Sequence, residues 1–134
     1  MAYGGLSDVA FITKNKASPV TITVKLTNAN NSATSLFTLE DTNGKKIGAT
    51  TKQATKASFV VPPSELVPAP ATLELALNPV SLVAGNITVW IEAFQDGAPL
   101  QVSKAGVPTD QDHAGVNVGS VPPSTDCGSN ITLL

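Results

Sequence analysis

The strict alternation of apolar and polar residues constrains this chain more than any other feature. Residues 19–27 (PVTITVKLT) place an aliphatic residue at every second position, and residues 86–94 (NITVWIEAF) repeat the pattern. Successive side chains of a β-strand point to opposite faces, so a period of two with many β-branched residues predicts half-buried strands. Helical periodicity would not bring these aliphatic residues onto one face. We therefore expect a fold built from sheets.

Turn residues divide the chain into short strands. Asn43-Gly44, within residues 35–50, predicts a hairpin with a two-residue type I′ turn, which would pair Asp41 with Lys46. Asp96-Gly97 predicts a second turn, after which residues 99–104 would return beside the preceding strand.

Residues 57–61 and 71–78 predict two further strands. The proline-rich segment between them cannot be a central strand, because proline lacks the N–H that a sheet ladder requires. Residues 71–78 also suit a short helix by propensity, but Pro79 would stop such a helix within about two turns, so a strand is favoured.

These signals predict an all-β fold with little or no helix. About seven to nine short strands, separated by turns roughly every 8–12 residues, are typical of a two-sheet antiparallel β-sandwich with Ig-like or jelly-roll architecture. A single domain over residues 1–134 is expected. Residues 105–129 would form a long irregular loop or arm, with 115–119 (GVNVG) as one short edge strand. The apolar end 131–134 (ITLL) would close a sheet edge, in this chain or in a neighbour.

The charge pattern excludes several classes of partner. Charged residues make up 13% of the chain, the net charge is −2 and all eight basic residues are lysines, so a nucleic-acid partner is not expected. No run of about 18 apolar residues occurs, so no membrane span is expected. The N-terminus as written lacks a Sec-type signal peptide. If Met1 is the native start, this predicts synthesis in the cytoplasm, with incorporation into a particle or export by another route.

Catalysis is not expected from the residues present. His113 is the only histidine, and we interpret it as a solvated loop residue without an adjacent nucleophile motif. Cys127 is the only cysteine; no cation lies directly beside it in the sequence, so it is interpreted as an incidental thiol in a loop. The acidic residues are scattered, and no pair is placed together by sequence spacing. The chain is therefore predicted not to be an enzyme.

One segment has the residue types of a calcium loop. Asp110, Asp112 and Asn117 resemble the start of an EF-hand loop in their spacing, with Gly115 at the sixth position. The pattern fails at the twelfth position, where Val121 replaces the bidentate glutamate. Calcium in an irregular loop is the only cofactor hypothesis, and a hydrated turn is the alternative.

The polar face of residues 86–95 carries the candidate binding residues. Trp90 and Phe94 lie on the face opposite the aliphatic residues, together with Thr88 and Glu92. Three interpretations compete: Trp90 packs beneath a loop or the proline-rich connector, Trp90 and Phe94 anchor a subunit interface, or Trp90 is an open platform for a sugar ring. The first is the most economical for a chain with six aromatic residues.

The low charge and the hydroxyl- and amide-rich surface favour contact with other proteins. The predicted function is a non-enzymatic protein–protein interaction module, a self-associating structural or accessory subunit of a larger assembly. The alternative is a carbohydrate-binding, lectin-like module, assisted by calcium, with a glycan as partner.

Overall fold

The computed structural model describes residues 8–27, 34–80, 86–120 and 127–134. The described part contains strands throughout, one short 3₁₀-helix and no α-helix. In chain order the elements are β1 (Val9–Phe11), β2 (Val20–Thr27), β3 (Thr34–Asp41), β4 (Lys46–Ala49), β5 (Lys56–Val61), η1 (Pro63–Glu65), β6 (Ala71–Val80), β7 (Asn86–Gln95), β8 (Ala98–Pro99), β9 (Val102–Lys104), β10 (Val107–Pro108), β11 (His113–Ser120) and β12 (Cys127–Leu133).

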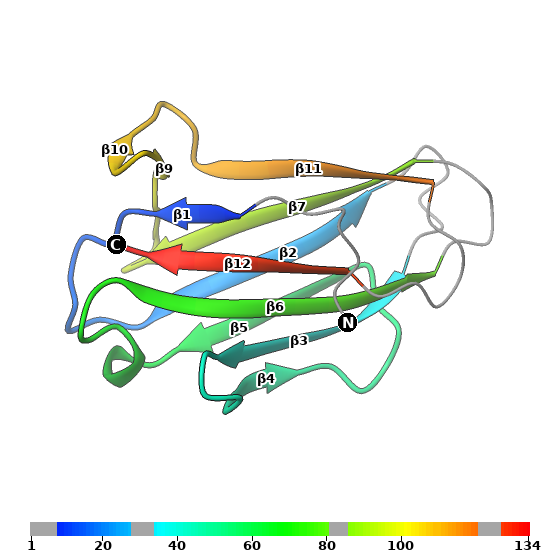
Figure 1. The fold of residues 1–134 in the computed structure, drawn as a ribbon, viewed down its shortest axis with the longest axis horizontal. Coiled ribbons are helices and arrows are strands. Elements are labelled where there is room, and N and C mark those ends of the chain that lie inside the picture. The colour runs from blue at the N-terminus through cyan, green and yellow to red at the C-terminus, as the bar shows by residue number, and fades with distance from the viewer. Residues whose placement is uncertain (1–7, 28–33, 81–85, 121–126) are drawn as a thin grey trace.

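The strands form two sheets, which confirms the all-β prediction (Figure 1). The seven-stranded sheet has the order β10-β9-β1-β12-β6-β3-β4, and the five-stranded sheet has the order β11-β7-β2-β5, with β8 beside β7. Neighbouring strands are antiparallel except β1 and β12, which run parallel, so the expectation of a purely antiparallel fold is wrong at this pair. The described part holds more strands than expected because two- and three-residue pieces extend the sheets.

One hydrophobic core receives the inward-facing residues of both sheets. The predicted alternation is confirmed: Val20, Ile22 and Val24 of β2 are fully buried, and Thr21 and Thr23 between them are half-buried. The aliphatic residues of β7 are buried in the same way. Burying one such side chain contributes roughly 1.5–3 kcal/mol, so the aliphatic stripe of each strand fixes which face turns inward.

The β3–β4 hairpin differs from its prediction. The backbone N–H of Asp41 donates to the carbonyl of Lys45 at 2.9 Å, and Glu40, not Asp41, is the partner of Lys46. Within this loop only Gly44 has a positive φ, of 82°. The loop therefore has three residues and closes with a glycine in the left-handed region. The Asp41 carboxylate accepts from the backbone N–H groups of Asn43 and Lys45, both at 2.9 Å, and this side-chain cap favours the longer loop.

The Asp96-Gly97 turn is confirmed, but the return strand is short. Both residues have positive φ, and Gln95 pairs with Ala98, as a two-residue type I′ turn requires. Pairing with β7 ends at β8, and the following strand β9 joins the seven-stranded sheet beside β1. The expectation that residues 99–104 all return beside β7 is therefore wrong. Leu100, fully buried at the crossover, holds the chain between the two sheets.

The predicted irregular segment 105–129 contains β10, β11 and the start of β12. β9 and β10 form a hairpin around Ala105-Gly106, both with positive φ, a turn that lacks the usual Asn-Gly or Asp-Gly signature. β11 is longer than the expected GVNVG edge strand and begins at His113. The segment is therefore largely sheet structure up to residue 120, and the remainder to residue 126 lies outside the described residues.

The C-terminal strand is internal to its sheet. β12 pairs with β6 on one side and with β1 on the other, and Ile131 and Leu133 are fully buried. The expectation that the apolar end closes a sheet edge is wrong, because β1 from the opposite end of the chain covers it. Cys127 is the first residue of β12, opposite Leu77, so its backbone belongs to a strand and not to a loop.

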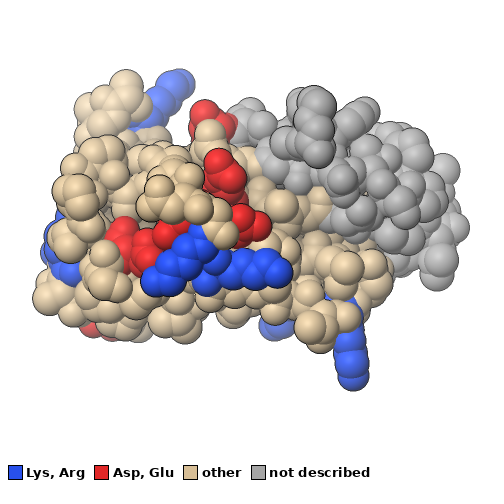
Figure 2. All heavy atoms as spheres, turned by 60° about the horizontal axis from the view of Figure 1, so that its bottom comes forward, with Lys and Arg blue, Asp and Glu red and all other residues tan. Residues whose placement is uncertain are grey.

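The outer side of the seven-stranded sheet carries mixed charge. Glu40 lies between Lys46 and Glu74 in the register of β4, β3 and β6. Lys45 forms an ion pair with Glu65 at 3.4 Å. Figure 2 shows acidic and basic side chains lying against each other on this side. The described residues contain no helix that is long and apolar enough to cross a membrane.

Candidate binding surface on the five-stranded sheet

The four predicted binding residues share one face of β7. Thr88, Trp90, Glu92 and Phe94 are all half-buried, whereas the residues between them are buried in the core. β7 is flanked by β11 and β2, so side chains of three strands surround this face. We call the outward-facing surface of the five-stranded sheet the outer face.

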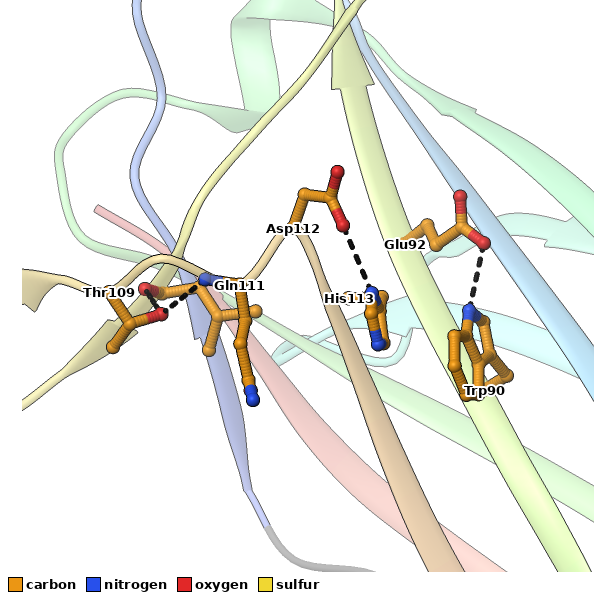
Figure 3. A network of polar contacts seen from close by, with 7 residues as sticks. Trp90, Glu92, Thr109, Gln111, Asp112 and His113 are labelled. Atoms are coloured by element: carbon orange, nitrogen blue, oxygen red, sulfur yellow. Dashed lines mark hydrogen bonds and ion pairs between the residues drawn. The ribbon is translucent and has the colours of Figure 1, made fainter.

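The indole of Trp90 has a neighbour on each side. The imidazole of His113, from β11, stacks on it with 4.1 Å between ring centroids and 11° between ring planes. From β2, on the other side of β7, the Lys25 Nζ lies 5.8 Å from the indole centroid, within cation–π range. Figure 3 shows the two rings standing side by side on neighbouring strands. These contacts of the Trp90 ring come from neighbouring strands of the same sheet, and cover by a loop or by the proline-rich connector stays a prediction.

Backbone register explains the stack. Gly115 lies directly opposite Trp90 and His113 directly opposite Glu92. A Cβ added at Gly115 would lie 3.4 Å from Cε3 of Trp90, so the missing side chain leaves the space that the indole covers. His113, two residues earlier on the same side of β11, is then in reach of the ring. Its interpretation as a solvated loop residue is wrong, because β11 begins at this position.

A ring nitrogen of each aromatic side chain lies within hydrogen-bond distance of a carboxylate oxygen. The Trp90 Nε1–H donates to Oε1 of Glu92 at 2.9 Å, and Nδ1 of His113 lies 3.0 Å from Oδ1 of Asp112 (Figure 3). These contacts fix the orientation of each ring about its axis. The result is a row from Asp112 through the stacked rings to Glu92.

Hydroxyl groups extend the outer face toward β5. Oγ1 of Thr23 and Oγ of Ser58 lie 3.2 Å apart across β2 and β5, and Val60 on β5 is 59% exposed. Hydroxyls and an exposed aliphatic side chain require little desolvation when another surface packs on them. This chemistry suits a protein contact.

The residues of the calcium hypothesis lie in the turn before β11 and within β11 itself. Asp110 is exposed in the turn before β11, where Oγ1 of Thr109 accepts from the backbone N–H of Gln111 at 3.2 Å and donates to the carbonyl of Val102 at 2.8 Å. Asp112 bonds to His113 instead. Asn117 lies within β11, opposite Thr88, and its side chain lies outside the described residues. In the described ranges no three His, Cys, Asp or Glu residues cluster as metal ligands would, and calcium stays a prediction.

Two arrangements were missed by sequence reasoning. The His113–Trp90 stack depends on a strand pairing between segments more than twenty residues apart, which no local pattern specifies. Glu40 and Glu74 lie opposite each other on β3 and β6, although nothing in the spacing of the acidic residues predicted that they would be neighbours. The sequence held one signal for the position of β11. Residues 115–119 (GVNVG) contain no charged residue, which is unusual for an edge strand exposed to solvent.

Comparison with known proteins adds a fold resemblance alone. Neither a protein-family model nor a curated protein matches the chain. Among solved structures, it is similar to the crystal structure of a domain of unknown function, DUF4425, from Bacteroides vulgatus, with a TM-score of 0.45 and 9% sequence identity. The match covers 89% of this chain and 97% of that chain.

Proposed function

We propose that this protein is a non-enzymatic protein–protein interaction module, a self-associating structural or accessory subunit of a larger assembly. We also infer that its two sheets are the layers of a β-sandwich, because their inward-facing residues share one core. The outer face supplies a partly exposed tryptophan, a residue type enriched at protein interfaces, together with hydroxyl groups, and Lys25 and Glu92 contact the indole.

One observation carries the choice between protein and sugar. A sugar ring stacks on the open face of an aromatic side chain, and here His113 lies on one side of the Trp90 indole and Lys25 on the other. A stacking ligand would first have to displace one of them. A protein side chain, in contrast, can pack against the accessible part of the half-buried indole without rearrangement. The carbohydrate-binding alternative, with or without calcium at Asp110 and Asp112, is therefore the weaker proposal.

The arrangement of polar groups also favours binding over catalysis. The pair of Asp112 and His113 has the form of an oriented base, but among the described residues no hydroxyl or thiol is hydrogen-bonded to the imidazole, whose ring face packs on Trp90. A nucleophile within hydrogen-bond reach of the base is what acyl-transfer chemistry requires. The stack gives His113 a packing role.

Sedimentation velocity over protein concentrations from about 1 µM to 1 mM tests the proposal. We expect a mass that rises with concentration in the wild type, and weaker association in Trp90→Ala. Thr72→Ala, on the outer side of the seven-stranded sheet, is the control and should associate as the wild type does. A monomer at every concentration, with no protein recovered on it from its native source, contradicts the proposal. Glycan binding that is lost in Trp90→Ala would support the alternative instead.

A further inference from the structure

β11 is the longest unpaired edge of either sheet in the described part of the chain. It spans eight residues, pairs with β7 on one side and has no described strand on the other. Figure 1 shows it along the rim of the molecule, beyond β7. The other sheet edges are β5 with six residues, β4 with four and β10 with two.

β11 also lacks charged residues and proline, two features that usually protect an edge strand, although a β-bulge follows Asn117. Lysines, prolines and short length discourage pairing with another chain. β4 begins at Lys46, β5 begins at Lys56, and β10 is short and ends at Pro108. The sequence of β11, HAGVNVGS, contains no lysine, arginine, acidic residue or proline. Its only titratable residue is His113.

The register shows which backbone groups face the open edge. In a two-residue hairpin the residues that flank the turn form a hydrogen-bonded pair, so the N–H and C=O of Gln95 point toward β8. The carbonyl of Ala93 confirms the alternation, because it accepts from the N–H of Leu100 at 2.8 Å. Since β8 and β11 lie on the same side of β7, the N–H and C=O of Ile91 point toward β11, where its partner is Ala114.

The same alternation continues along β11. Ala114 and Val116 bond to β7, and therefore the N–H and C=O groups of His113, Gly115 and Asn117 point away from it. A β-bulge follows Asn117, so residues 113–117 form the regular part of the edge, with Gly115 at its centre.

We propose that β11 pairs with β11 of a second copy of this chain, antiparallel, about a twofold axis that passes by Gly115. In this register Gly115 pairs with itself, and His113 lies opposite Asn117 of the second copy at each end. Each of these pairs can exchange two hydrogen bonds, using the groups that face the open edge. The pairing brings together no like charges, and it joins two five-stranded sheets into one continuous sheet.

A second copy fits this edge better than an unrelated peptide does. A twofold interface requires a self-complementary patch, and a regular run of uncharged backbone centred on a glycine is self-complementary when it runs antiparallel. Gly115 places no side chain on the outer face at the twofold, where the side chains of two paired residues would stand next to each other, and Trp90 lies beside that position. This inference rests on the proposed function and specifies its partner and contact.

A pair of isosteric variants tests the axis. Gly115→Asp places two carboxylates opposite each other at the twofold, whereas Gly115→Asn adds nearly the same volume without charge. We expect the dimer dissociation constant of Gly115→Asp to exceed that of Gly115→Asn at least tenfold at low ionic strength, with a smaller difference in 1 M salt, where the screening length is about 3 Å. Circular dichroism of both variants verifies that the fold is retained.

The outcomes separate this inference from the proposed function. If the wild type associates and the two variants associate equally, pairing at β11 is wrong and self-association through another surface stands. If the wild type is monomeric at every concentration, a second copy is not the occupant, and any binding that remains would have to involve a different protein.

Amide hydrogen exchange provides a readout at single residues. In dilute protein the N–H groups of Ala114 and Val116 should be protected by β7, while those of His113, Gly115 and Asn117 exchange rapidly. At concentrations where the dimer forms, all five should become protected. Protection that does not change with concentration at His113, Gly115 and Asn117 would overturn the proposal.

Discussion

The imidazole of His113 lies nearly parallel to the indole of Trp90, with 4.1 Å between the ring centroids. This contact joins β11 to β7 on the outer face, above a position where Gly115 contributes no side chain. An edge strand with few large side chains has few ways to hold its place by packing. The stack is therefore a principal side-chain contact for the start of β11.

Replacing His113 by alanine should loosen β11. Stacked aromatic pairs contribute about 0.5–1.5 kcal/mol beyond their buried area, so His113→Ala should lower the free energy of unfolding by about 1 kcal/mol in urea titration. Trp90 is the only tryptophan, so its fluorescence emission should shift to longer wavelength as the ring gains solvent. His113→Phe keeps a ring and should retain most of both properties; equal losses in the two variants would contradict the role of stacking.

Capping of the β3–β4 loop by Asp41 predicts a second effect. Its side chain is largely buried, and one oxygen accepts two backbone N–H groups. Asp41→Ala leaves both donors without this partner and should cost about 2 kcal/mol of unfolding free energy. Asp41→Asn retains an oxygen at the same position and should cost less than half as much. A similar loss in both variants would show that the negative charge, and not the acceptor, stabilises the loop.

A third prediction concerns Gln95, which is 2% exposed at the end of β7. Its side-chain oxygen accepts from the backbone N–H groups of Lys14 and Asn15 at 2.8 and 3.0 Å, and its amide donates to the carbonyls of Asn15 and Ser18. One side chain thus satisfies four backbone groups of the connection between β1 and β2.

Gln95→Met keeps the length of the side chain and removes every hydrogen bond. We expect a loss of about 2–4 kcal/mol in chemical denaturation, because four partly buried backbone groups would lose their partner. Gln101→Met is the matched control, since Gln101 is exposed and should change stability by less than about 0.5 kcal/mol. Equal effects at the two positions would show that the hydrogen bonds of Gln95 contribute little.

The alternation of apolar and polar residues predicted the strands, because the apolar residues of each strand are the ones that are buried in the core. The aliphatic residues of β2 and β7 occupy the core as the period of two required, and Asp96-Gly97 makes the expected turn. The turn at Asn43-Gly44 was predicted with the wrong length, because the side chain of Asp41, outside the dipeptide, supplies the bonds that select a three-residue loop.

Long-range pairing was beyond the reach of the same patterns. Whether residues 131–134 lie at an edge or in the middle of a sheet depends on where β1 pairs, and three residues at the other end of the chain give no periodic signal. For the same reason, only part of the candidate site was predicted from the sequence. Trp90 and Glu92 follow from the alternation along β7, but His113 and Lys25 reach the indole only through the strand order β11-β7-β2.

A close approach between the sheets gives the last prediction. A Cβ added at Gly48 on β4 would overlap the ring of Phe59 on β5, a core residue that is 5% exposed. Gly48→Ala should therefore cost about 1–3 kcal/mol of unfolding free energy, the usual effect of overpacking. The glycine of β11 serves as control, because a Cβ at Gly115 meets Trp90 at an ordinary distance of 3.4 Å and Gly115→Ala should be close to neutral.

A double-mutant cycle identifies the cause of the Gly48 effect. Phe59→Leu removes ring atoms from the space that the new methyl group would enter, so Gly48→Ala should cost less than half as much in the Phe59→Leu background as in the wild type. Residues in contact show such coupling energies of roughly 0.5–3 kcal/mol, whereas independent sites add. Additive losses in the cycle would mean that the cost of Gly48→Ala does not arise from its contact with Phe59.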